Sequence, residues 1–104
     1  MNKERIDMLK KLQEEDPLDP FPLYGLALEY SKEKPELAEA FFEQLLQEHV
    51  DYLPVYYTAA HFLANKGEDD KAIAILRKGI ALSIVQGNEK ATRELKSALE
   101  QLEF

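Results

Sequence analysis

The chain has 104 residues and a mass of 12.0 kDa, the size of one domain with a modest core. It contains no cysteine, which excludes disulfides and thiolate metal sites, and its first residues hold no uninterrupted apolar run. The formal charge of -7 is concentrated in residues 1–50, which hold 12 acidic and 6 basic side chains. Such a surface repels phosphate backbones, so we expect no binding of nucleic acid. Because the first residues hold neither a signal peptide nor a membrane span, we expect a cytoplasmic protein that does not bind a membrane.

The first half of the chain predicts three helices separated by prolines. Residues 2–15 place Ile6, Leu9 and Leu12 at three-residue spacing between charges, which is typical of a narrow apolar helix stripe. Three prolines within residues 16–22 force a turn, because proline lacks an amide donor and restricts the residue before it. A second helix then runs to about Lys32, and a third runs from Pro35 to near His49.

The second half predicts three more helices. One runs from about Leu53 to Asn65 and closes at Gly67, which can adopt the left-handed conformation that ends helices. The next begins in the acidic residues 68–70 and reaches about residue 86. Gly87 ends that helix, and Asn88 caps the last one. Six helices and no strands predict an all-α fold.

A pattern of large and small residues occurs twice. It reads Leu23-x2-Leu26-Ala27-x2-Tyr30 with Ala38-x3-Phe42, and returns as Tyr56-x2-Ala59-Ala60-x2-Leu63 with Ala72-x3-Leu76. The first block recurs after 33 residues and the second after 34. A fixed period of this size predicts stacked helix pairs. The expected core comprises Leu23, Leu26, Ala27, Tyr30, Ala38, Phe42, Leu45, Tyr56, Ala59, Ala60, Leu63, Ala72, Leu76 and Ile80.

These two blocks resemble the tetratricopeptide repeat family over roughly residues 9–86. The resemblance implies a helix-turn-helix array in one domain, with residues 20–52 and 53–86 as complete repeats. Residues 1–17 would be the second helix of an incomplete leading repeat, and residues 88–104 a capping helix. Leu23 and Tyr56 stand where the family prefers tryptophan, and Val50 and Ile84 replace its closing proline.

The resemblance also implies a protein-binding adaptor or scaffold, because family members bind peptides or partner segments in a concave groove lined by the first helix of each repeat. We call the corresponding residues the first-helix surface. They are Phe21, Tyr24, Leu28, Ser31, Lys32, Pro54, Tyr57, His61 and Asn65. Lys32 and Asn65 alone match the polar set with which some members grip a peptide's C-terminal carboxylate, so that mode of binding is not expected.

Other interpretations of this surface stay open at this stage. It could be covered by a second copy in a homodimer, or by the chain's own terminal helices. His61 and Tyr57 lie one turn apart and are candidates for an acid/base pair, but no third group accompanies them. Two histidines without cysteine or metal-ligand spacing predict no metal site, and four isolated glycines make no phosphate loop. We therefore expect no enzyme and no cofactor.

Overall fold

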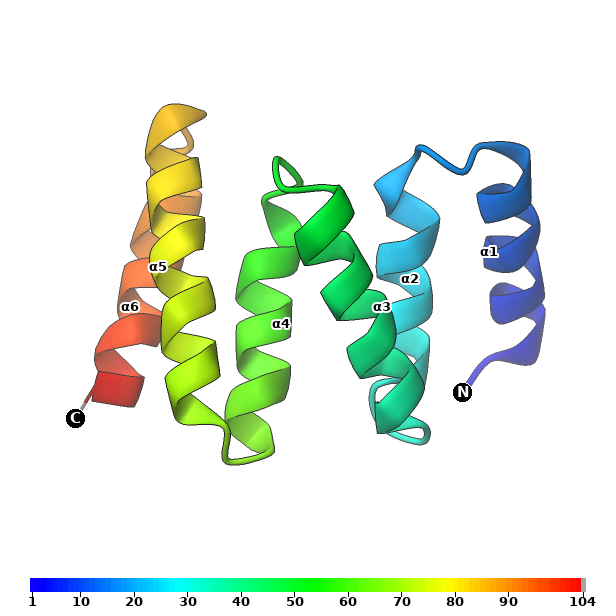
Figure 1. Cartoon of the computed structure of the whole chain (residues 1–104), viewed down its shortest axis with the longest axis horizontal. Helices are drawn as coiled ribbons and strands as arrows, with labels where there is room; N and C mark the ends of the chain where they lie inside the picture. Colours follow the sequence, from blue (N-terminus) through cyan, green and yellow to red (C-terminus); the bar gives the residue numbers. More distant parts are fainter. Residues whose placement is uncertain (104) are drawn as a thin grey trace. The chain divides into compact units, whose positions relative to one another are not determined.

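The computed structural model describes residues 1–103, which form six helices and contain no strand (Figure 1). The helices are α1 Lys3–Glu15, α2 Pro20–Tyr30, α3 Pro35–Glu48, α4 Pro54–Asn65, α5 Asp69–Val85 and α6 Glu89–Glu103. They fall into two compact units, the first unit up to Tyr52 and the second unit from Leu53 onward. The predicted all-α class and number of helices are confirmed. The last residue of the predicted capping segment, Phe104, lies outside the described residues. No helix in this part of the chain is long and apolar enough to cross a membrane.

Side-chain caps and prolines set the beginnings of the helices. The Asn2 side chain accepts a hydrogen bond from the Arg5 amide at 3.0 Å, and the Asp19 side chain accepts one from the Phe21 amide at 3.0 Å. Each cap satisfies an amide that has no partner inside its helix. Pro20 occupies the first turn of α2, as the sequence predicts.

Two glycines end helices in the second unit. Gly67 and Gly87 have φ values of +81° and +68°, in the left-handed region that other residues rarely adopt. The amides that follow them donate back to the carbonyls of Leu63 and Ser83, each at 2.9 Å. These bonds close the last turns of α4 and α5. Asn88 then caps α6 by accepting from the Ala91 amide at 3.0 Å, which confirms the predicted stop and start.

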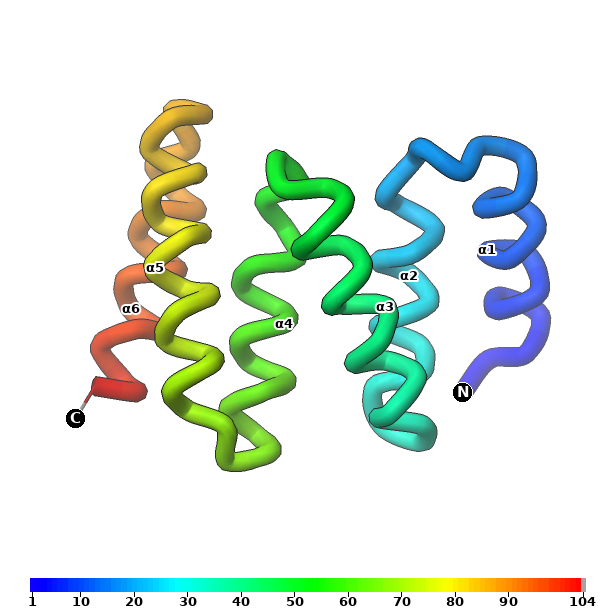
Figure 2. The backbone as a smooth tube through the Cα atoms, viewed as in Figure 1, coloured from blue at the N-terminus to red at the C-terminus, as the bar shows by residue number. Residues whose placement is uncertain are grey.

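The core of the first unit lies between α2 and the two helices that flank it. Figure 2 shows α2 beside α3, and the two helices are in contact. Ala27 of α2 and Ala38 of α3 are both fully buried. On the other side, α1 packs against α2 so closely that a Cβ added at Gly25 would lie 2.8 Å from Cδ2 of Leu9. All the core residues predicted for this unit are buried.

The core of the second unit is built by α4, α5 and α6. The six predicted core residues from Tyr56 to Leu76 are buried, but Ile80 is only half-buried. Its neighbour Gly79 faces the other helices instead, because a Cβ there would lie 2.8 Å from Cβ of Tyr56 and 3.3 Å from Cδ2 of Leu95. The prediction that Ile80 belongs to the core is therefore wrong, and the neighbouring Gly79 occupies the buried position.

Candidate functional site

The first unit carries part of the first-helix surface on one face of α2. Phe21 is 51% exposed and Leu28 is 43% exposed, although most of this helix is buried. Ser31 and Lys32 lie just after α2, which ends at Tyr30, so the predicted helix is two residues too long. The Ser31 hydroxyl donates to the Leu28 carbonyl at 2.9 Å, and Lys32 is exposed. This face is thus apolar along the helix and polar at its end.

Tyr24 is more buried than Phe21 and Leu28 on the same face of α2. Its ring meets the ring of Tyr52 edge to face, with centroids 5.6 Å apart and planes at 69°. Burial raises the pKa of the Tyr52 hydroxyl, and the neighbouring Tyr24 and Asp19 add to that shift. Tyr24 is therefore half-buried by contact with the segment after α3. Sequence reasoning missed Tyr52, because this residue lies in a connection outside both copies of the repeat pattern.

In the second unit, the first-helix surface lies along α4 from its first residue to its last. Tyr57 is 44% exposed, and Pro54, His61 and Asn65 are exposed. The rings of Tyr57 and His61 are nearly parallel, with centroids 6.4 Å apart and an interplanar angle of 7°. Parallel stacking brings ring faces together and does not by itself align the tyrosine hydroxyl with an imidazole nitrogen for proton transfer. The pair forms an aromatic platform on α4.

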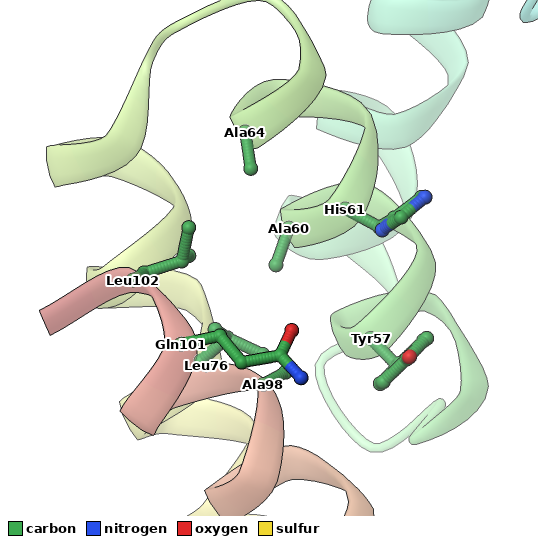
Figure 3. Close-up of a pocket in the computed structure, with 8 residues that line it drawn as sticks. All are labelled: Tyr57, Ala60, His61, Ala64, Leu76, Ala98, Gln101 and Leu102. Carbon is green, nitrogen blue, oxygen red and sulfur yellow. The ribbon is translucent and has the colours of Figure 1, made fainter. Parts of the chain in front are cut away.

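A pocket of about 110 Å³ opens beside this platform. Figure 3 shows the side chains from α4, α5 and α6 that line it. The lining comprises Tyr57, Ala60, His61, Ala64, Leu76, Ala98, Gln101 and Leu102. Sequence reasoning found Tyr57 and His61 but missed the three residues of α6, which carries no copy of the repeat pattern. The pocket links the predicted surface to a helix that we expected to act only as a cap.

The two units differ in charge. The first unit, residues 1–52, holds 13 acidic and 6 basic side chains, whereas residues 53–104 hold 7 of each. The whole excess of seven negative charges therefore belongs to the first unit. Among residues 1–103, no group of three or more histidine, cysteine or acidic side chains is placed to hold a metal ion.

Comparison with known proteins gives the class of this fold. The family model of the tetratricopeptide repeat matches residues 29–82. A solution NMR structure of a tetratricopeptide repeat domain protein from Salinibacter ruber is 34% identical, with a TM-score of 0.79, over 85% of this chain and 90% of that one. A crystal structure of a tetratricopeptide repeat domain protein from the same organism is 32% identical, with a TM-score of 0.76, over 82% and 96%. No curated protein matches the chain.

The chain belongs to the tetratricopeptide repeat family. Members of this family are helical-repeat modules that typically bind proteins or peptides, and they are generally not catalytic.

Proposed function

We propose that the chain is an adaptor that binds a peptide, or an extended segment of a partner protein, on the first-helix surface. The observation that carries the proposal is the exposure of Phe21, Leu28 and Tyr57 on α2 and α4, two helices that bury most of their apolar residues. Large apolar side chains on the surface of a helix often mark an interaction site, and each unit carries such side chains on its own helix. Aromatic anchors suit this role because they bury much area and lose little side-chain entropy.

The proposal includes a division of the chain into repeats. Residues 20–52 and 53–86 would be two complete repeats, preceded by a leading helix in residues 1–17 and followed by a cap in residues 88–104. The boundary between the two compact units, after Tyr52, supports this division because it coincides with the proposed repeat boundary. In this arrangement α2 and α4 are the first helices of the two repeats and both contribute to binding.

The charge of the first unit favours a basic partner. Its seven excess negative charges would speed association with a segment rich in lysine and arginine. Screening by salt weakens this attraction, so the association rate should fall as ionic strength rises. The apolar anchors then hold the bound segment, since most differences in affinity arise in the dissociation rate.

A displayed library of random peptides, selected on the wild-type chain, supplies a ligand for the test. We expect the triple change Phe21→Ser, Leu28→Ser, Tyr57→Ser to weaken binding of a selected peptide more than about a hundredfold, since buried anchors often contribute ~2 kcal/mol or more each. Tyr24 is not substituted in this variant, because its ring packs against Tyr52 and its loss could destabilise the fold. Leu37→Ser is a matched control, because Leu37 is 45% exposed but lies on α3.

The same variants separate peptide binding from self-association. Sedimentation velocity over a range of concentrations should show a monomer at every concentration if the first-helix surface serves another protein. A wild-type dimer that the triple variant abolishes, together with failure to select any peptide, would replace the adaptor function with self-assembly. A triple variant that remains folded and keeps full affinity for the peptide would place the site elsewhere.

A further inference from the structure

The pocket in the second unit is a distinct feature beside the first-helix surface. Its apolar lining comprises three alanines, Ala60, Ala64 and Ala98, together with Leu76 and Leu102. Small side chains on facing helices leave a hollow that larger residues would fill. The Tyr57 ring, the His61 ring and the Gln101 amide supply its polar groups (Figure 3). The lining thus combines apolar side chains with hydrogen-bonding groups.

The last turns of α6 hold one wall of this pocket in place. Leu95 is buried against α5, and Glu103 forms an ion pair with Arg77 of α5 near the end of the helix. These contacts lie on either side of Gln101 and fix the helix that carries it. The wall formed by Ala98, Gln101 and Leu102 is therefore positioned by packing that does not involve a ligand.

We propose that this pocket takes one branched aliphatic side chain, of the leucine or isoleucine class, from an extended peptide, while Gln101 pairs with the adjacent main-chain amide. This inference about the natural ligand rests on the proposed function, because the side chain would belong to the bound partner. Recognition of the side chain itself requires only the second unit.

Size and chemistry select this class of occupant. A buried apolar cavity of about 150 Å³ accommodates benzene, so a volume of about 110 Å³ is better matched to a branched aliphatic group than to an aromatic ring. None of the eight lining side chains is a carboxylate, so a lysine or arginine side chain in the pocket would lose water and gain no opposite charge.

Gln101 adds specificity for a peptide. A glutamine side chain offers both a carbonyl acceptor and an amide donor, which match the N–H and C=O groups of an extended main chain. Gln101 is exposed, so its amide is accessible from solvent. A free hydrocarbon offers no such groups and would not use Gln101.

The probe for this test is N-acetyl-leucine N-methylamide, which carries one side chain between two amides. Titration into the ¹⁵N-labelled chain should shift the amide signals of Ala60, Ala64 and Ala98 and the side-chain amide of Gln101. We expect a Kd on the order of 1 mM, which is typical of a ligand of this size. The alanine analogue should bind at least about tenfold more weakly because it buries less apolar area. The phenylalanine and lysine analogues should also bind more weakly.

Variants locate the binding. Ala98→Leu should fill the pocket and abolish the shifts, whereas Ala81→Leu, on an exposed position of α5, should leave the Kd unchanged. Gln101→Met keeps the length of the side chain but removes its amide, and should raise the Kd about threefold to tenfold. Equal binding of the leucine and phenylalanine analogues, or an unchanged Kd in Gln101→Met, would overturn the inference.

The outcomes also distinguish this inference from the proposed function. Phe21→Ser with Leu28→Ser lies in the first unit and should leave the Kd of the leucine probe unchanged. Selected peptides that depend on those two residues, with no binding of the leucine probe at the pocket, would retain the adaptor function and overturn the pocket. Binding of the leucine probe without any selectable peptide would retain side-chain recognition by the pocket and overturn the adaptor function.

Discussion

Replacing Gly79 by alanine should destabilise the chain even though alanine is the better helix former. Gly79 lies inside α5, where the change contributes about 1 kcal/mol in helix propensity. The added Cβ, however, would lie 2.8 Å from Cβ of Tyr56 and 3.3 Å from Cδ2 of Leu95. The Tyr56 atom is attached directly to the backbone of α4, so relief of the clash requires movement of a helix.

The expected magnitude follows from these opposing terms. Overpacking a well-packed core costs about 1–3 kcal/mol, and a clash against a backbone-attached atom belongs near the upper end of that range. After the gain in helix propensity, we expect Gly79→Ala to lower the free energy of unfolding by about 1–2 kcal/mol. For a domain of this size the loss corresponds to a fall in Tm of roughly 4–16 °C.

Gly25→Ala is the matched comparison. Gly25 also lies inside a helix, and its added Cβ would meet Cδ2 of Leu9 at 2.8 Å, but that methyl is at the end of a flexible side chain. A shifted Leu9 rotamer costs about 0.5–1.5 kcal/mol, which offsets the helix propensity. Thermal and urea unfolding followed by circular dichroism should therefore show little change for Gly25→Ala. If Gly79→Ala were as stable as Gly25→Ala, the close approach of α4, α5 and α6 would be refuted.

Three further changes test other features. Tyr52→Phe should reduce the loss of stability above pH 10, as measured by urea unfolding at pH 8 and 11. Because the pKa of the Tyr52 hydroxyl is raised in the folded state, its contribution to stability is complete below the ordinary tyrosine pKa of 10.0 and is lost as pH rises through the folded-state pKa. Ser83→Ala should cost ~1 kcal/mol in urea unfolding, because the buried Ser83 hydroxyl bonds to Thr92 Oγ1 at 2.6 Å. Truncation after Gly87 removes α6 and should increase binding of a hydrophobic dye; an unchanged signal would show that α6 covers no apolar surface.

Most helix boundaries were readable from the sequence because local chemistry decides them, although the end of α2 was placed two residues too late. Proline at positions 20 and 35 and glycine at 67 and 87 restrict the backbone whatever surrounds them. The two copies of the repeat pattern likewise identified the buried face of each repeated helix, since a helical period fixes which residues share a face.

The sequence does not show in the same way which of two neighbouring residues lies in the core. Ile80 and Gly79 are adjacent, and hydrophobicity favours Ile80 for the core. The separation between α4 and α5 leaves no room for a side chain at position 79, so the glycine takes the contact and Ile80 is half-buried. That distance depends on the packing of three helices, and a pattern within one helix does not contain it.

Part of the candidate site could likewise be predicted from the pattern within one helix, and part depends on how the helices pack. Tyr57 and His61 were identified because they share a second face of their helix, at positions that line the groove in the resembled family. Gln101 belongs to a helix without the repeat pattern. The helix α6 packs Leu95 against α5, and its final turns lie beside α4, where they line the pocket. Packing against α5 and formation of the pocket consequently use the same helix. Leu95 on the buried face would control stability, while Gln101 on the adjacent face would control recognition, so the two roles can be separated by substitution.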